Sequence, residues 1–449
     1  MLTSLAALMT ALDSMVVMTA LPAIRLDLNA SVEELEWTVN AYTLAFAVLL
    51  MAGTALGDRY GRRRVFAMGL VVFTVGSVAC ALAPGIGWLI AARVAQGVGG
   101  AGVMAVAQAL LGAAFGPQER PKALGVFGAV TGLATLVGPI VGGVVVQNVA
   151  WQWIFWINIP VGMVLLPLIL TRLTESTGDA RRFDIGGVVL ATVAAFGLVW
   201  GFVRGNEAGW SSVEVVGGFV MGAAAVAGFV WWELRTPEPL LPIRFFGSRA
   251  FSAGNSAMFL LFGCAMSGVF FFAQFLQTAL HYDALATGLR LAPWTVAVFI
   301  GSPIAGRLVT RFGERPLVVA GLLLQAIASG WIALIATPDM TYVEMVAPFV
   351  ISGAGIALAV PAVMATVFSS VPPAAVGAAS GTSTTMRQLG GVFGIAVSVS
   401  VFATVGGYGS AKQFSDGFSA AIATAAALAL VGAVAGLVIP KRQTEVVEA

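Results

Sequence analysis

About fourteen apolar segments, each near the twenty residues that cross a bilayer, divide this 449-residue chain, and short polar connections separate them. The predicted spans are residues 2–22, 37–56, 65–83, 88–113, 123–146, 153–171, 185–203, 213–234, 251–280, 289–309, 317–336, 342–368, 378–405 and 417–438. Charged residues make up only 10% of the chain, whereas a soluble domain has about 25%. We therefore predict an all-α, multi-pass integral protein of the cytoplasmic membrane.

The chain lacks the residues that several classes of function require. The formal net charge is +2, so there is no strongly basic composition to favour a nucleic-acid partner. Cys80 and Cys264 lie inside apolar spans and His281 is the single histidine, which argues against a metal site. We find no nucleophile with a neighbouring base and no phosphate-binding loop. We therefore expect no enzyme activity, no ATP drive and no cofactor.

The basic residues are distributed unequally between alternate connections, and this distribution predicts the orientation. Most of the 23 lysines and arginines fall in one set of connections, and such residues stay on the cytoplasmic side when short loops insert. Both termini are therefore predicted to be cytoplasmic. An even number of crossings is required, which either fourteen or twelve would satisfy.

An internal repeat favours fourteen crossings. The arginine-rich turn Asp58–Arg64 recurs in degenerate form as Thr310–Arg315. At the same offset, the stretch Gly138–Gly142 recurs as Gly390–Gly394. The chain therefore contains two six-helix halves in parallel orientation, an arrangement typical of transporters with a binding site near the membrane midplane.

The repeat also predicts the division of the chain. Residues 1–171 would form the N-terminal six-helix bundle, and residues 172–250 a linker with two additional transmembrane helices, 185–234. Residues 251–449 would form the C-terminal six-helix bundle and a short cytoplasmic tail.

Several short motifs, taken in order, carry a resemblance to a known family. They are Leu12-Asp13 through Leu21-Pro22, Asp58 to Arg62, Arg93 with Gln96 and Gly97, Gly138-Pro139-Ile140-Val141-Gly142-Gly143, Trp151 to Pro160, and Arg387 to Gly391. With these motifs the chain resembles the major facilitator superfamily, and within it the fourteen-helix drug:proton antiporters of the multidrug efflux type. Two departures are Thr54, where a glycine is usual, and Gln152, where arginine is frequent.

Asp13 is the candidate proton carrier. It lies eleven residues beyond Leu2, which is roughly 16 Å along a helix and near the middle of the bilayer core. A charge there costs about 2.5 to 3.5 kcal/mol, so the group is expected to exchange a proton. The alternative is a structural salt bridge to Arg93 or Arg387.

Arg93 is the second candidate for proton coupling. A guanidinium cannot release its own proton, so its expected role is to pair with a carboxylate or polar group when the proton leaves. The resemblance implies a coupling role for this arginine. The alternative is an arginine that extends to the membrane interface and contributes nothing to transport.

Two further motifs have both structural and functional interpretations. The first motif is the arginine-rich turn with Asp58, Arg59, Gly61 and Arg62, whose structural role is a topology signal. We also interpret it as a cytoplasmic conformational latch between helix ends. The stretch from Gly138 to Gly143 contains a proline kink and small residues that let helices approach closely. The resemblance implies that Gly138, Pro139, Gly142 and Gly143 form the antiporter motif; without it they indicate only a kink and a packing edge.

Aromatic, amide and thioether side chains are the candidates for the substrate cavity, because aromatic faces attract organic cations and methionine adapts to varied shapes. The candidates are Asn40, Tyr42 and Phe46 in the second span, Met266, Phe270, Gln274 and Gln277 in the ninth, Trp294 in the tenth and Arg387 in the thirteenth. Packing or interface anchoring is the alternative role for each aromatic residue.

The sequence thus favours a monomeric, proton-coupled antiporter that exports amphipathic, often cationic, drugs or toxic small molecules by alternating access. Its expected partners are a small-molecule substrate, protons and the lipid bilayer. Two alternatives stay open at this stage. One is a dedicated exporter of an endogenous metabolite, lipid or self-made antibiotic, and the other is a non-transporting sensor on the same scaffold.

Overall fold

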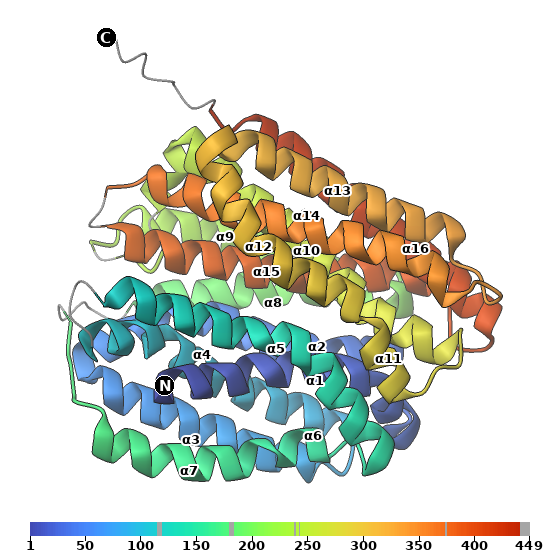
Figure 1. The fold of residues 1–449 in the computed structure, drawn as a ribbon, viewed down its shortest axis with the longest axis horizontal. Helices are drawn as coiled ribbons and strands as arrows, with labels where there is room; N and C mark the ends of the chain where they lie inside the picture. The colour runs from blue at the N-terminus through green and yellow to red at the C-terminus, as the bar shows by residue number, and fades with distance from the viewer. Residues whose placement is uncertain (115–118, 179–183, 238, 242, 373–374, 441–449) are drawn as a thin grey trace.

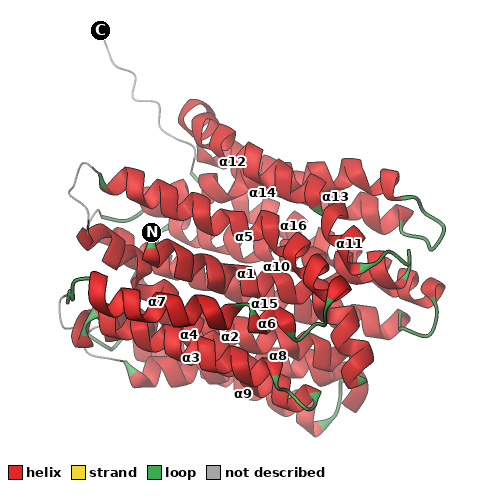
Figure 2. Cartoon of the chain, turned by 60° about the horizontal axis from the view of Figure 1, so that its bottom comes forward, coloured by secondary structure: helices red, strands yellow, loops and turns green. Residues whose placement is uncertain are grey.

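Long apolar helices form the body of the molecule in the computed structural model (Figures 1 and 2). The structure describes residues 1–114, 119–178, 184–237, 239–241, 243–372 and 375–440. Within these ranges fourteen helical segments are long and apolar enough to cross a membrane, and no strand occurs. The predicted all-α membrane fold with fourteen spans is confirmed.

The N-terminal half is a bundle in which α2 and α3 pack against α4, and α1 packs against α5. Its helices are α1 (Leu2–Leu28), α2 (Val32–Tyr60), α3 (Arg62–Ala81), α4 (Ile86–Ala114), α5 (Arg120–Asn148), α6 (Trp153–Trp156) and α7 (Asn158–Arg172). The short α6 continues into α7 after a break at Ile157, and together they form one span.

The C-terminal half forms a second layer above the first in Figure 1. It begins with the 3₁₀ turn η1 (Ile243–Gly247) and contains α10 (Arg249–Thr278), α11 (Ala284–Arg290), α12 (Ala292–Phe312), α13 (Glu314–Ile335), α14 (Tyr342–Ser369), α15 (Val376–Val405) and α16 (Ala411–Leu437). Here α14 packs against α12 and α13, while α10 packs against α15 and α16. The span predicted at 289–309 starts earlier and is divided at Leu291 into α11 and α12.

The inserted pair consists of α8 (Ile185–Ala208) and α9 (Val213–Glu233). Each begins at a side-chain cap, because Asp184 accepts a hydrogen bond from the Gly187 amide at 2.8 Å and Ser212 accepts one from the Val215 amide at 3.3 Å. The pair packs against α2 and α15 through α8, in a buried cluster of Leu44, Val48, Val199, Val203, Val392 and Ala396. It therefore joins one helix from each half, and the exact division at 171 and 250 stays a prediction.

The second helix starts earlier than predicted, at Val32 instead of residue 37. Ser31 forms a capping box with Glu34: the Glu34 amide donates to Ser31 Oγ at 3.2 Å, and the Ser31 amide donates to Glu34 Oε2 at 2.9 Å. This reciprocal cap extends the helix through a polar stretch. As a result Glu36 lies inside the helix and is buried.

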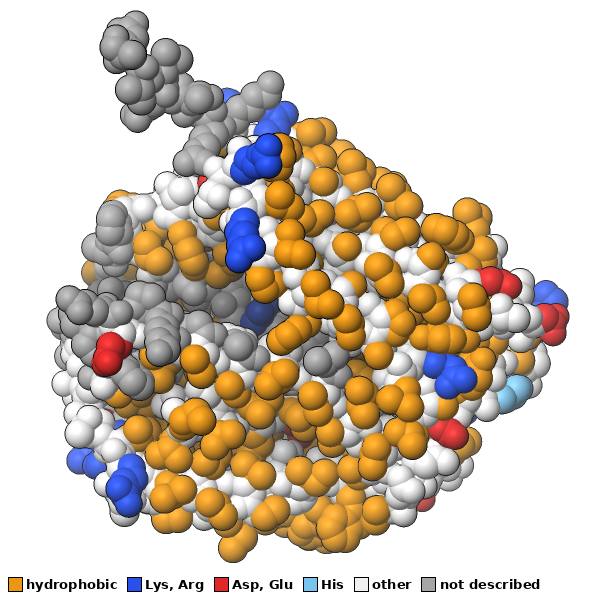
Figure 3. Space-filling model, in the orientation of Figure 1, with side chains coloured by type: hydrophobic (Ala, Val, Ile, Leu, Met, Phe, Trp, Pro, Cys, Tyr) orange, Lys and Arg blue, Asp and Glu red, His pale blue; other side chains and the backbone are white. Residues whose placement is uncertain are grey.

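Hydrophobic side chains cover much of the face of the molecule that Figure 3 shows. Large side chains such as Leu334 and Val343 are 88% and 76% exposed. Patches of this extent are unfavourable in water and favourable in hydrocarbon, while the helices satisfy their own backbone hydrogen bonds. The bilayer is therefore the natural solvent of this fold.

The two halves contact each other at the ends predicted to be external. Gln277 Nε2 donates to the Thr19 carbonyl across the interface at 3.1 Å. Arg25 at the end of α1 lies 3.7 Å from the ring centroid of Tyr408, in the connection between α15 and α16. These contacts close the external end in this structure.

Two glycines let α5 and α11 meet backbone to backbone at the same end. A Cβ added at Gly143 would lie 2.4 Å from the Ala284 carbonyl oxygen. A Cβ added at Gly288 would lie 2.3 Å from the Pro139 carbonyl oxygen. Since such distances are far inside van der Waals contact, this closure requires glycine at both positions.

We predict that Gly143→Ala shifts the protein away from external closure, because the added methyl group must push α5 from α11. Crosslinking between cysteines placed at Thr19 and Gln277 should become slower than in the parent protein. Gly132→Ala is the matched control on the same helix, since a Cβ there meets nothing within 4 Å. Equal crosslinking rates in both variants would contradict this account of the closure.

Candidate functional site

A buried ion pair joins α1 to α4 in the N-terminal half. Asp13 is 1% exposed, and its Oδ2 accepts a hydrogen bond from Arg93 Nη1. Its Oδ1 accepts hydrogen bonds from Gln96 Nε2 at 3.2 Å and from Asn158 Nδ2 of α7 at 2.9 Å. Donors from α4 and α7 therefore hold the carboxylate of α1, and both of its oxygens have partners.

Arg93 also has several hydrogen-bond partners. Its Nη1 also donates to Gln96 Oε1 at 2.9 Å, and its Nε donates to the Thr38 carbonyl of α2 at 3.1 Å. The guanidinium carbon lies 4.3 Å from the ring centroid of Tyr42, within the range of a cation–π contact. The arginine, 1% exposed, is thus packed in the protein interior and does not extend to the membrane interface.

Gln96 is the centre of this network. Its Nε2 also donates a hydrogen bond to Ser77 Oγ at 2.8 Å, and its Oε1 accepts one from Cys80 Sγ at 3.1 Å. Ser77 and Asn158 were not among the predicted site residues. Asn158 lies in the motif Trp151–Pro160, so the sequence signal existed, whereas Ser77 has no distinguishing pattern.

The network has a simple electrostatic consequence. Two opposite charges removed from water are tolerable only as a hydrogen-bonded pair, and removing one of them leaves a costly uncompensated charge. A proton on Asp13 would cancel its charge and weaken its hold on Arg93. Arg93 would still keep Gln96 Oε1 and the Thr38 carbonyl as acceptors.

A cavity of about 410 Å³ lies between the two halves. Its walls come from α1, α2, α4 and α5 on one side and from α10, α12, α14 and α15 on the other. Gly128 and Arg387 place it in the halves of α5 and α15 that begin on the predicted cytoplasmic side. Because the predicted external end is closed, we interpret this as an inward-open arrangement. Figure 3 shows the surface hollowed between the two layers.

Five of the predicted substrate residues line this cavity: Tyr42, Phe46, Met266, Trp294 and Arg387. The prediction missed Thr10, Ser14, Met15, Met104, Thr131, Phe262, Ser302 and Gln388, which also line it. Small hydroxyl residues carry no sequence signal for a cavity, because the same residues are common at helix contacts in membranes.

Four predicted cavity residues lie elsewhere. Asn40 is buried beside Glu36, and Phe270 packs edge-on against Phe271 in the second bundle. Gln274 donates to the Phe270 carbonyl at 2.9 Å and accepts from Tyr408, while Gln277 belongs to the external closure. Phe270, Gln274 and Gln277 have the spacing of one face of a helix. Helical spacing does not specify which neighbouring helix such a face contacts.

Tyr42 connects the ion pair to the cavity. Its ring covers the Arg93 guanidinium and also forms part of the cavity wall, and its hydroxyl donates to the Thr10 carbonyl at 3.1 Å. Asp13 is not among the lining residues, although its neighbours on α1, Ala11 and Ser14, are. The carboxylate is therefore separated from the cavity in this state.

Glu36 is a buried carboxyl that the sequence analysis overlooked by starting the second span at residue 37. It is fully buried, and its Oε1 accepts from Asn40 Nδ2 at 2.9 Å. Among the described residues, neither its Oε2 nor Asn40 Oδ1 has a hydrogen-bond partner. A buried charge with an unpartnered oxygen is unfavourable, which favours a protonated Glu36 in this state.

The arginine-rich turn binds the chain that follows α7. Asp58 pairs with Arg62 at 2.7 Å, and the Arg63 amide donates to Glu175 Oε1 at 2.9 Å. Gly61 has φ 106°, and a Cβ there would lie 2.7 Å from the Glu175 carboxyl carbon. These contacts all lie within the N-terminal half and the start of the linker; Arg59 lies over the Tyr60 ring.

The glycine-proline motif packs α5 against α1. A Cβ at Gly138 would lie 2.5 Å from Met15 Cβ, and one at Gly142 would lie 2.1 Å from Thr19 Oγ1. Pro139 lies between them inside the helix. Gly138 and Gly142 thus face α1, whereas Gly143 faces α11.

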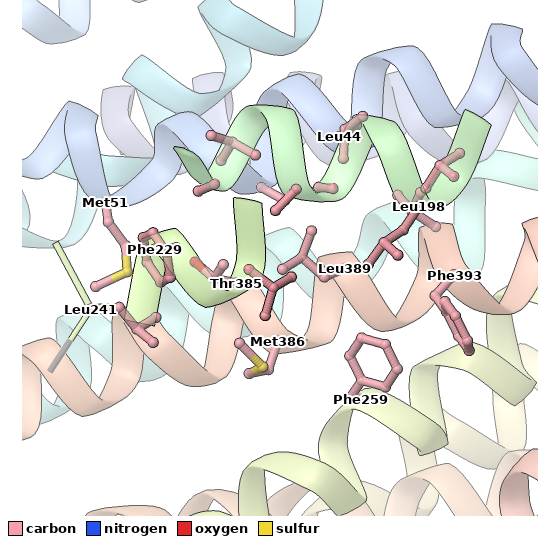
Figure 4. Close-up of a pocket in the computed structure, with 18 of the residues that line it drawn as sticks. Leu44, Met51, Leu198, Phe229, Leu241, Phe259, Thr385, Met386, Leu389 and Phe393 are labelled. Atoms are coloured by element: carbon pink, nitrogen blue, oxygen red, sulfur yellow. The ribbon is translucent and has the colours of Figure 1, made fainter. Parts of the chain in front are cut away.

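A second pocket of about 240 Å³ lies beside the inserted pair (Figure 4). Leu44 and Met51 of α2, Leu198 of α8, Phe229 of α9 and Thr385 of α15 line it, among others. Its wall is almost entirely apolar.

Among the residues that the structure describes, no group of three His, Cys, Asp or Glu side chains is arranged to hold a metal ion.

Comparison with known proteins gives consistent matches along the chain. A family model described as Major Facilitator Superfamily matches residues 3–395. The multidrug resistance protein Stp of Mycobacterium tuberculosis is 35% identical over 403 residues, covering 89% of this chain and 75% of the relative. The tetracenomycin C resistance and export protein of Streptomyces glaucescens is 36% identical over 393 residues, covering 87% and 73%.

Solved structures support the fold. A crystal structure of the peptide transporter POT in complex with sulfate matches with a TM-score of 0.70 and 14% identity, covering 97% of this chain and 94% of the other. At that identity the likeness concerns the fold alone.

We predict that Arg93→Gln strongly destabilises the protein, because breaking a buried pair by removing one partner costs about 3 to 5 kcal/mol. The double variant Asp13→Asn with Arg93→Gln should be more stable than Arg93→Gln alone, since no uncompensated charge is left. Melting temperatures of the purified protein in detergent measure both. A double variant that melts below the single one would contradict a coupled pair.

A second stability test concerns Glu36. Glu36→Gln should melt at the parent temperature or above it, because the new amide can donate to the unpartnered Asn40 Oδ1. Asn40→Leu should lower the melting temperature, since it removes the side chain that donates to the carboxyl group. If Glu36→Gln destabilised the protein as much as Asn40→Leu, Glu36 would need to be charged in this state.

Proposed function

This chain belongs to the major facilitator superfamily, and we propose that it exports amphipathic small molecules across the cytoplasmic membrane in exchange for protons. One observation carries the proposal: a fully satisfied Asp13–Arg93 pair lies directly behind the wall of a cavity that both halves share. Relatives named for drug resistance and antibiotic export support the direction of transport.

The proton site is Asp13 in this proposal. In the inward-open state it is charged and held by Arg93, Gln96 and Asn158. When a proton binds Asp13 from the external side, the carboxyl loses its charge and Arg93 keeps only its neutral acceptors. Arg93 never releases a proton, and it acts by changing how strongly α4 holds α1.

The same helix connects the proton site to the external closure. Asp13 lies on α1 less than two turns before Thr19, whose carbonyl accepts the hydrogen bond from Gln277. A movement of α1 that follows protonation would therefore displace Thr19 and the surface that meets Gly142. Occupation of Asp13 and closure of the external end are in this way linked through one rigid helix.

The substrate would occupy the cavity between the halves. Tyr42, Phe46 and Trp294 supply aromatic surface and Met266 supplies an adaptable thioether. A substrate against Tyr42 touches the ring that covers Arg93. The expected preference for cations would rest on aromatic rings alone, because the described residues of the lining include no carboxylate.

The arginine-rich turn acts as a latch in this proposal. In the inward-open state the turn holds the residues after α7: the Gly178 amide donates to the Asp58 carbonyl, and Arg63 pairs with Glu175. In the outward-open state we expect them to bind helix ends across the cytoplasmic interface. Asp58, Arg59 and Arg62 supply the charges, and Gly61 allows the sharp turn.

We predict that Asp13→Asn abolishes gradient-driven efflux, because an amide cannot take up and release a proton. The assay is efflux of a fluorescent dye from proteoliposomes under an imposed pH gradient, with protein-free liposomes as the baseline. Unchanged gradient-driven transport would remove Asp13 from the mechanism.

In the same assay Asp58→Asn should slow transport while membrane insertion stays normal. If insertion were lost instead, the turn would be only a topology signal.

A further inference from the structure

The central cavity contains one charged side chain among the described residues that line it, and that side chain is Arg387. It projects from α15, with Gln388 beside it on the same helix. The other lining residues are aromatic, aliphatic, thioether or hydroxyl side chains. The electrostatic character of the cavity therefore depends on this arginine.

Arg387 has no acidic partner among the residues that the structure describes. The structure shows no hydrogen bond or ion pair for it among the described residues, and its Nε is shut off from solvent without an acceptor. The nearest aromatic contact is Phe262, whose ring centroid lies 5.3 Å from the guanidinium carbon. Arg93, by contrast, has a carboxylate, an amide oxygen and a carbonyl as acceptors.

Asp13 cannot neutralise Arg387 in this state. Both oxygens of Asp13 are taken by Arg93, Gln96 and Asn158. The ring of Tyr42 lies between that network and the cavity. The ion pair behind the wall is neutral as a unit, so the described lining of the cavity carries a net positive charge.

We propose that Arg387 binds an acidic group of the substrate, such as a carboxylate, phenolate or sulfonate on an aromatic molecule. A guanidinium offers donors in a planar fork that matches two acceptor oxygens, and the low-dielectric surroundings strengthen the attraction. The inference rests on the proposed export function and specifies its substrate class: aromatic acids in preference to aromatic cations.

The surrounding side chains fit such a molecule. Tyr42 and Phe46 from the N-terminal half, together with Phe262 and Trp294 from the C-terminal half, can cover its rings. The cavity of about 410 Å³ is within the range of drug-sized sites. An aromatic acid held at Arg387 would touch both halves at once, so its binding would be sensitive to their relative position.

The test compares two xanthene dyes of opposite charge, fluorescein and pyronin Y, with the full-length protein in detergent. Binding is measured by fluorescence anisotropy at mildly alkaline pH, where fluorescein is an anion. The parent protein should bind fluorescein more tightly than pyronin Y. Arg387→Gln should weaken fluorescein binding on the order of tenfold to a hundredfold, as expected for loss of charged hydrogen bonds, and should leave pyronin Y binding unchanged or stronger.

Two further variants separate specificity from structure. Arg387→Lys keeps the charge without the fork and should retain part of the preference for fluorescein. Arg307→Gln removes an exposed charge from α12 and should leave the binding of both dyes unchanged. An equal loss of both dyes in Arg387→Gln, or a parent protein that prefers pyronin Y, would overturn the proposal.

The binding assay uses no proton gradient, so it can fail independently of the export function. Gradient-driven efflux without a preference for fluorescein would reject the role of Arg387 and leave export intact. Selective binding of fluorescein without gradient-driven efflux would reject proton-coupled export and leave the acid site intact. Melting temperatures of all variants confirm that each binding change occurs in folded protein.

Discussion

The Asp13–Arg93 ion pair is the interaction on which the rest of the structure depends. It replaces hydration for two charges that the membrane would otherwise exclude, and it does so by drawing donors from α4 and α7 and an acceptor from α2 onto a single site. The first bundle is therefore organised around a polar centre. Since α1 also forms part of the interface between the halves, any change in that centre reaches the interface through a packed helix.

The sequence was sufficient for the fold because the strongest signals are compositional and periodic. The sequence shows fourteen apolar segments, an unequal distribution of basic residues between alternate connections, and an internal repeat. None of these requires knowledge of tertiary contacts, and the helices follow the apolar segments closely. The start of α2 was predicted too late because a capping box carries a helix through Ser31 and Glu34, where hydropathy is low. Because of this difference, the sequence analysis did not recognise Glu36 as a buried carboxyl group.

The site was only partly accessible to sequence reasoning. Asp13 and Arg93 attracted attention as charges inside spans, and pairing between them was one of the alternatives considered. The amide and hydroxyl groups that complete their network, Gln96, Asn158 and Ser77, are ordinary residues whose role depends on which helices meet. For the same reason Gln274 and Gln277 were placed in the cavity although they lie toward the external contact: a shared helical face does not reveal its neighbour.

The inserted helix pair gives the molecule two unlike sides. On one side α8 is packed against both α2 and α15, and Asn206 of α8 donates to the Ser400 carbonyl of α15, so a helix of each half is fastened to a common element. On the other side α5 meets α11 through the backbone atoms beside Gly143 and Gly288. No side-chain hydrogen bond or ion pair joins the two helices among the described residues. A relative movement of the two halves that preserves these contacts of α8 would pivot close to α2 and α15. The largest displacement would then fall on α5 and α11, the helices that meet through Gly143 and Gly288.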